Sequence, residues 1–184
     1  MLPVFFQLLE QGFIHESFPG CSVRQLVCNQ LGLDPRYLEE RVQTVFLDHK
    51  PVDDLDSAIL QKGSVLALSA AMPGLAGATL RKGGRFAVLR RQISCGLQDD
   101  CRSAEKTQVT VKYFNMIARE LGKAQFEKGV RLKGSYLNGF FNKHIETLKP
   151  NISSIRLDGR EIDSSALSGI VWDKEVFLVL KSEA

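Results

Sequence analysis

The sequence predicts an α+β protein built from two small units in tandem, each a mixed sheet with one main helix. Three observations predict this fold class. A nine-residue stretch recurs at an offset of 110, the apolar segments follow the same order in both halves, and Val109, Val111 and Tyr113 alternate with polar residues as in a half-buried strand. The predicted units are residues 1–84 and 107–184, joined by a connector at 85–106.

The repeat is clearest around two turns that contain aspartate. Residues 45–53 read VFLDHKPVD and residues 155–163 read IRLDGREID. Three identities align these stretches: Leu47 with Leu157, Asp48 with Asp158, and Asp53 with Asp163. When the offset is increased by one residue, to 111, residues 65–68 align with residues 176–179. Asp158-Gly159 is typical of a tight two-residue turn, whereas His49 in the place of Gly indicates a looser turn in the first copy.

Each half then reads as two strands, a helix, a short strand, a turn and a final strand. The helices are expected at 22–31 and 135–148, with Ser22 and Ser135 as candidate N-caps. The strands are expected at Val4–Leu9, Phe13–Phe18, Val42–Leu47, Val65–Leu68, Val109–Phe114, Phe126–Leu132, Ser153–Leu157 and Val176–Leu180. Eight residues are predicted to be buried: Leu26, Val27, Leu47, Leu68, Phe140, Phe141, Leu157 and Val179.

Several short motifs resemble the ThiS/MoaD family of sulfur carriers, which are small β-grasp (ubiquitin-like) proteins. Residues 109–115 (VTVKYFN) with 119–122 (RELG) resemble the opening strand and first helical turn of that family, and 155–162 resembles its hairpin. Residues 172–176 (WDKEV) and 61–65 (QKGSV) resemble the entry to its last strand. The resemblance implies tandem β-grasp units and a link to sulfur transfer or to molybdopterin or thiamine cofactor metabolism.

The carrier activity of that family rests on a C-terminal Gly-Gly, whose carboxylate is adenylated and converted to a thiocarboxylate. The second unit ends LKSEA and would lack this group. Gly83-Gly84 follows the last strand of the first unit, but Arg85 comes next. The leading hypothesis is therefore a non-catalytic protein that binds a protein partner or an anion. The alternative is a sulfur carrier activated as a thiocarboxylate after cleavage behind Gly84.

A basic, glycine-rich segment is the most unusual feature of the sequence. Residues 57–98 contain no Asp or Glu and carry six Lys or Arg residues. Glycine lets backbone amides turn toward an anion, and Arg binds carboxylate or phosphate through two hydrogen bonds. The candidate anion- or partner-binding residues are Arg81, Lys82, Gly83, Gly84 and Arg85. The competing interpretation is a connector with a solvated basic face, followed by an extra strand or short helix at Phe86–Ile93.

The composition of the 184 residues is that of an ordinary globular protein, with 44% hydrophobic and 24% charged residues. A well-mixed net charge of +3 predicts no nucleic-acid partner. The sequence contains no run of 18 apolar residues, so no membrane span is expected. The apolar residues 1–9 lack the basic start and cleavage site of a signal peptide, so a cytoplasmic location is expected.

No spacing of catalytic or metal-ligating residues stands out, so we expect neither enzymatic activity nor a cofactor or metal. The three histidines are far apart in the sequence: His15, His49 and His144. Cys21 and Cys28 lie in or beside a predicted helix, which is typical of free thiols that pack as small hydrophobic groups. For Cys95 and Cys101 the sequence leaves a metal site, a disulfide and free thiols open. It does not determine the oligomeric state.

Overall fold

The computed structural model describes residues 3–71, 74–84, 105–150 and 154–180. The chain forms two compact units. The larger unit is His15–Ile117, and the smaller unit combines Met1–Ile14 with Ala118–Ala184. Both contain helices and strands, which confirms the α+β class. No helix in the described part of the chain has the length and apolar character needed to cross a membrane.

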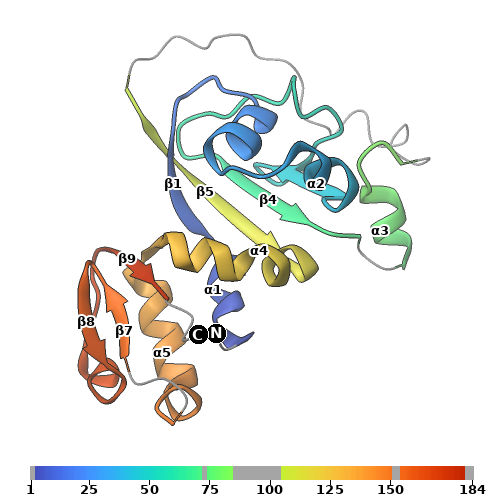
Figure 1. Ribbon diagram of the computed structural model, residues 1–184. Coiled ribbons are helices and arrows are strands. Elements are labelled where there is room, and N and C mark those ends of the chain that lie inside the picture. The colour runs from blue at the N-terminus through green and yellow to red at the C-terminus, as the bar shows by residue number, and fades with distance from the viewer. Residues whose placement is uncertain (1–2, 72–73, 85–104, 151–153, 181–184) are drawn as a thin grey trace. The chain divides into compact units, whose positions relative to one another are not determined.

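The larger unit holds a mixed sheet with the strand order β3-β2-β4-β5-β1. Figure 1 shows its strands β4, β5 and β1 side by side. Strands β2 and β4 are antiparallel, whereas β4 and β5 are parallel, with Val65 opposite Thr110 and Ser69 opposite Phe114. Its elements are β1 (Phe13–Ser17, from His15 onward), the π-helix η2 (Gln25–Gln30), α2 (Pro35–Glu40), β2 (Thr44–Leu47), β3 (Lys50–Pro51), β4 (Val65–Ser69), α3 (Gly74–Leu80) and β5 (Thr107–Phe114).

The smaller unit holds a sheet with the order β6-β9-β7-β8, in which each neighbouring pair is antiparallel. The start of β1 also pairs here, because Ile14 lies opposite Arg131. Its elements are the 3-10 helix η1 (Pro3–Phe5), α1 (Phe6–Gln11), α4 (Asn115–Lys128, from Ala118 onward), β6 (Val130–Lys133), α5 (Gly134–Leu148), β7 (Ser154–Leu157), β8 (Arg160–Asp163), the 3-10 helix η4 (Ser164–Gly169) and β9 (Glu175–Val179).

This division of the chain differs from the predicted units 1–84 and 107–184. Residues 107–114, expected to open the second unit, form β5 and pair with β4 in the larger unit. Residues 1–14, expected in the first unit, belong to the smaller one. The smaller unit therefore has an antiparallel sheet rather than the expected mixed one. Both crossings between units lie inside secondary-structure elements, β1 and α4, where no turn or change of composition marks a boundary.

The N-terminal segment Val4–Leu9 was expected to be a strand and is instead helical, in η1 and α1. Phe5, Leu8 and Leu9 are all buried, and their spacing of three and four residues is that of one helix face. A short apolar run does not distinguish a strand from a buried helix by periodicity alone. Similarly, the first residues of the predicted strand Phe126–Leu132 end helix α4, and β6 begins only at Val130.

Predicted elements elsewhere agree closely with the structure. The helix expected at 135–148 is α5, but Lys133 rather than Ser135 occupies its N-cap position. The helix expected at 22–31 is mostly the π-helix η2. Ser22 caps the helical turn at residues 23–24 that leads into η2: its Oγ accepts from the Gln25 amide at 3.2 Å, while Gln25 Oε1 accepts from the Ser22 amide at 2.9 Å. The predicted segment Phe86–Ile93 and connector residues 85–104 lie outside the described residues.

An aspartate clasp repeats in the two units. In the larger unit, the Asp48 amide donates to the Val65 carbonyl at 2.9 Å, and Asp48 Oδ1 accepts from the Val65 amide at 2.7 Å. In the smaller unit, Asp158 makes the same two bonds to Phe177, each of 2.8 Å. Each clasp ties a hairpin turn to the final strand of its unit.

Both hairpin turns have the same backbone geometry. Asp48 and His49 have φ of 50° and 67°, and Asp158 and Gly159 have φ of 48° and 79°. Two consecutive residues with positive φ define the tight turn that matches the twist of a hairpin. The expectation that His49 loosens the first turn is therefore wrong.

The clasp also corrects the alignment of the final strands. Val65 is equivalent to Phe177, an offset of 112, and not to Val176 as the sequence alignment had it. Burial follows the corrected register, because Leu66 and Leu68 are buried, as are their equivalents Leu178 and Leu180. Val179, predicted to be buried, is half-buried. The other seven predicted core residues are buried.

The core of the smaller unit is a cluster of phenylalanine rings from three helical segments. Phe5 lies 5.2 Å from Phe140 and 6.1 Å from Phe126 between ring centroids, and Phe140 lies 5.5 Å from Phe141.

We predict that Phe140→Ala lowers the free energy of unfolding by about 3–5 kcal/mol, because it removes a side chain that is only 2% exposed and leaves a cavity. Urea unfolding followed by tryptophan fluorescence measures this, and a loss below about 1 kcal/mol would contradict it.

The clasp gives a second stability prediction. Asp158→Ala removes the side-chain acceptor of the Phe177 amide and places alanine at a positive φ, so unfolding should become easier by about 1–2 kcal/mol. Asp158→Asn is the matched control, since asparagine retains an acceptor oxygen and tolerates this φ. Equal stability of the alanine and asparagine variants in urea would show that the clasp contributes nothing.

Candidate functional site

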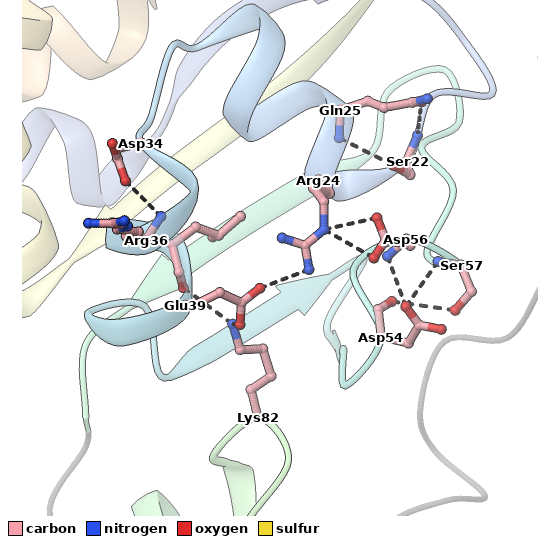
Figure 2. Close-up of polar contacts among 11 residues, drawn as sticks. Ser22, Arg24, Gln25, Asp34, Arg36, Glu39, Asp54, Asp56, Ser57 and Lys82 are labelled. Atoms are coloured by element: carbon pink, nitrogen blue, oxygen red, sulfur yellow. Dashed lines mark hydrogen bonds and ion pairs between the residues drawn. The ribbon is translucent and has the colours of Figure 1, made fainter.

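The densest polar network in the described residues lies in the larger unit and centres on Arg24 (Figure 2). The Arg24 Nε donates to both carboxylate oxygens of Asp56, at 2.9 and 3.0 Å, and its terminal nitrogen donates to Glu39 Oε1 at 2.8 Å. The other oxygen of Glu39 lies 3.2 Å from the ammonium of Lys82. Four charged side chains are thus linked in one chain: Arg24 from the turn just before η2, Glu39 from α2, and Asp56 and Lys82 from two loops.

Local structure positions the members of this network. The N-cap residue Asp34 accepts from the amides of Arg36 and Tyr37, which starts the helix that carries Glu39. Asp54 Oδ1 accepts from the amides of Asp56 and Ser57 and fixes the turn that carries Asp56. The backbone that carries Glu39 and Asp56 is therefore held by local hydrogen bonds that do not involve Arg24.

The predicted anion-binding segment joins this network at Lys82. Its ammonium donates to the Leu38 carbonyl at 3.2 Å as well as to Glu39, and its backbone amide donates to the Gln43 carbonyl at 2.7 Å. The Gly83 amide donates to Asp53 Oδ1 at 3.2 Å. The Lys82 ammonium and the backbone amides of Lys82 and Gly83, which could donate to an anion, therefore donate to acceptors within the chain.

The remaining predicted site residues do not complete an anion site in the described structure. The Gly84 amide donates to the Arg81 carbonyl at 3.1 Å, so it too has an acceptor. Arg81 is exposed and makes interactions of its own. Arg85 lies outside the described residues. Anion binding by Arg81–Arg85 thus stays a prediction.

The network shifts the pKa values of its members in opposite directions. Hydrogen bonds from Arg24 and then Lys82 lower the pKa of Glu39. The hydrogen bond to Glu39 raises the pKa of Arg24. Burial raises the pKa of the nearby Cys28 thiol, which keeps it protonated and poorly nucleophilic.

Two of the three histidines, His15 and His144, interact with glutamine side chains. His15 bonds to Gln30, whose Nε2 in turn donates to the buried thiol of Cys21 at 3.5 Å. His144 Nε2 lies 3.0 Å from Gln7 Oε1. Burial lowers the pKa of both imidazoles. Neither of these two contacts joins a histidine to a carboxylate, which is the pair that commonly serves acid–base catalysis.

The cysteines give no metal site in the described part of the chain. Cys21 and Cys28 are free thiols. Within the same residues, no three His, Cys, Asp or Glu side chains gather closely enough to hold a metal ion. Cys95 and Cys101 lie outside the described residues.

Sequence reasoning missed an open cavity of about 840 Å³ at the start of α5, in the smaller unit. The Asn138 side chain holds its wall, because it donates to the Trp172 carbonyl and accepts from the Trp172 amide, both at 3.0 Å. A Cβ on Gly134 would lie 2.2 Å from the Trp172 carbonyl oxygen, so only glycine fits there. Lys133, Lys174, Asp173 and Glu175 line the cavity, and their formal charges cancel.

Sequence reasoning also missed the open face of the sheet in the smaller unit. Phe177 is 36% exposed on β9, which has a strand on each side. Arg131 lies directly opposite it on β6, and the half-buried Val179 lies opposite Arg156 on β7. Residues opposite each other point to the same side of a sheet, so Phe177, Val179 and two arginines share one face. The misaligned final strand hid this, because it placed Phe177 one position out of register.

We compared the chain with known protein families, curated proteins and solved structures, and none of the three comparisons gives a match.

The Glu39 pKa gives a testable pH dependence. Its carboxyl titrates at lower pH in the folded than in the unfolded chain, so the unfolded state binds more protons and stability falls as the pH falls. We expect wild type to be more stable than Glu39→Gln above about pH 4.5, and this difference to vanish as the pH drops well below about 4. Urea unfolding at several pH values measures it. Glu40→Gln is the control, and an undiminished Glu39 difference at the lowest pH would refute the expectation.

Proposed function

We propose that this chain is a non-catalytic tandem β-grasp protein that binds a partner protein through the open sheet face of its smaller unit. One observation carries the proposal: a large aromatic side chain, Phe177, stands exposed on an inner strand of a sheet, with Arg131 directly opposite it and Arg156 opposite Val179 on the other neighbouring strand. Exposed aromatic and arginine side chains are the residues that contribute most to protein–protein binding.

The repeated hairpin plan supports the β-grasp part of the proposal. Each unit ties a hairpin to a final strand through an aspartate clasp, at Asp48 or Asp158. Each buries one face of its sheet with helical residues, such as Leu26 and Val27 in the larger unit and Phe140 in the smaller one. The mixed sheet of the larger unit is the arrangement that the ThiS/MoaD resemblance implies. The link to sulfur transfer or cofactor metabolism rests on that resemblance alone.

The charges on the face favour a particular kind of partner. Lys133 lies opposite Glu175, and Arg156 lies opposite Glu161, so these cations face carboxylates across the strands. Arg131 instead lies opposite Phe177. A partner segment that places an apolar side chain over Phe177 and a carboxylate beside Arg131 would match both groups.

Phe177 is held in place rather than loose on this surface. A Cβ added to Gly129 would lie 2.2 Å from its ring, so the ring covers the backbone of Gly129. This glycine has a φ of 98°, a conformation that other residues rarely adopt. A ring fixed in this way loses little conformational freedom when a partner binds, which favours affinity.

The sulfur-carrier alternative has less support. It needs cleavage behind Gly84 and a free glycine tail, but the amides of Gly83 and Gly84 both donate to acceptors of the chain. An anion-binding function at Arg81–Arg85 has less support for the same reason.

The test uses a peptide array in which apolar residues are flanked by Asp or Glu, with Lys-flanked versions of the same peptides. We expect wild type to prefer the acidic versions, and Phe177→Ala to weaken their binding by about tenfold or more. Arg131→Gln should reduce the preference for acidic over basic versions. Val171→Ser is the control, because Val171 is 74% exposed but lies outside the strands of the sheet. Equal binding by the Phe177 and Val171 variants would refute the proposal.

A further inference from the structure

The segment Lys82–Gly84 lies against the body of the larger unit, held from three elements. Gln43, just before β2, accepts the Lys82 amide, helix α2 binds its ammonium through Leu38 and Glu39, and the loop after β3 binds the Gly83 amide through Asp53. The Lys82 side chain is only 12% exposed. For a lysine this is a low value, and it reflects the docking of the whole side chain.

From these contacts we infer that Lys82–Gly84 is a latched segment and that the latch controls proteolytic cleavage of the chain at this position. A protease must draw several residues into an extended conformation in its active site. The bonds of Lys82 and Gly83 to the body must break first, so cleavage requires a local opening. When opening is fast relative to cleavage, the cleavage rate follows the population of the open form.

Glu39 is the part of the latch that connects it to the rest of the unit. One of its oxygens binds Lys82 and the other binds Arg24, which Asp56 holds through two further hydrogen bonds. Figure 2 shows this chain of contacts from Asp56 to Lys82. Any ligand or modification that draws Glu39 away would leave the Lys82 ammonium with the Leu38 carbonyl alone among these acceptors, and the segment would open more often.

Gly83 allows the second half of the latch. Its φ is 60°, which lets the chain turn so that the amide meets Asp53. A side chain at Gly83 would meet no atom within 4 Å, so space is not the reason for glycine there. The reason is the positive φ of this residue, which glycine adopts more readily than other residues.

Limited trypsin digestion of the full chain, with fragments assigned by intact mass, tests this inference. Trypsin cuts after lysine, and to do so at Lys82 it must extract the side chain from its contact with Glu39. The reference is the Lys62–Gly63 bond of the same molecule, where Lys62 is exposed. We expect Glu39→Gln to speed cleavage at Lys82–Gly83 by about tenfold relative to Lys62–Gly63, since it removes one charge-assisted hydrogen bond.

A second variant and a control complete the experiment. Asp53→Ala should also speed cleavage at Lys82–Gly83, because it frees the Gly83 amide, and hydrogen exchange of that amide should rise with it. Glu40→Gln, one residue along α2 and exposed, should leave both rates unchanged. The inference is wrong if neither Glu39→Gln nor Asp53→Ala changes the ratio of the two cleavage rates, whether both rates stay constant or rise together. Peptide binding by the smaller unit is measured separately, so the digestion result neither supports nor contradicts the proposed function.

Discussion

The hydrogen-bond clasp between an aspartate and a final strand is the constraint on which the rest of this structure depends. Each clasp uses both the amide and the carboxylate of one residue, so it fixes the hairpin turn and the register of the neighbouring strand together. A strand that slips by one residue turns its buried side chains to solvent. Asp48 and Asp158 therefore decide which residues of β4 and β9 enter the core.

A second constraint follows from the parallel pairing of β5 with β4. β5 follows β4 in the chain only after 37 residues (70–106), yet it pairs with β4 along five residue positions. Its buried face carries Val109, Val111 and Tyr113, which complete the core of the larger unit. The strand that the repeat assigns to the second unit thus serves the first, and the smaller unit closes its sheet with an antiparallel strand, β6.

The two regions of functional interest use these frameworks differently. In the smaller unit, the register set by Asp158 turns Phe177 outward on the face that we propose for partner binding. In the larger unit, Arg24, Glu39 and Lys82 form a surface network that gains little energy per ion pair, since exposed pairs are screened by water. The value of this network lies in its position, because it holds a chain segment that would otherwise be open to cleavage.

The sequence alone determined what depends on local contacts. Helix α5, strands such as β2 and β5, and the two hairpin turns follow from apolar periodicity and from Asp at turn positions, and these act within a few residues. Tertiary structure decided the rest. Whether Val4–Leu9 is helical, which unit receives β5, and whether Lys82 meets an anion or Glu39 all depend on contacts between residues far apart in the chain. A sequence pattern shows that β5 needs a neighbouring strand, but β4 and β9 have such similar patterns that only the three-dimensional packing selects between them.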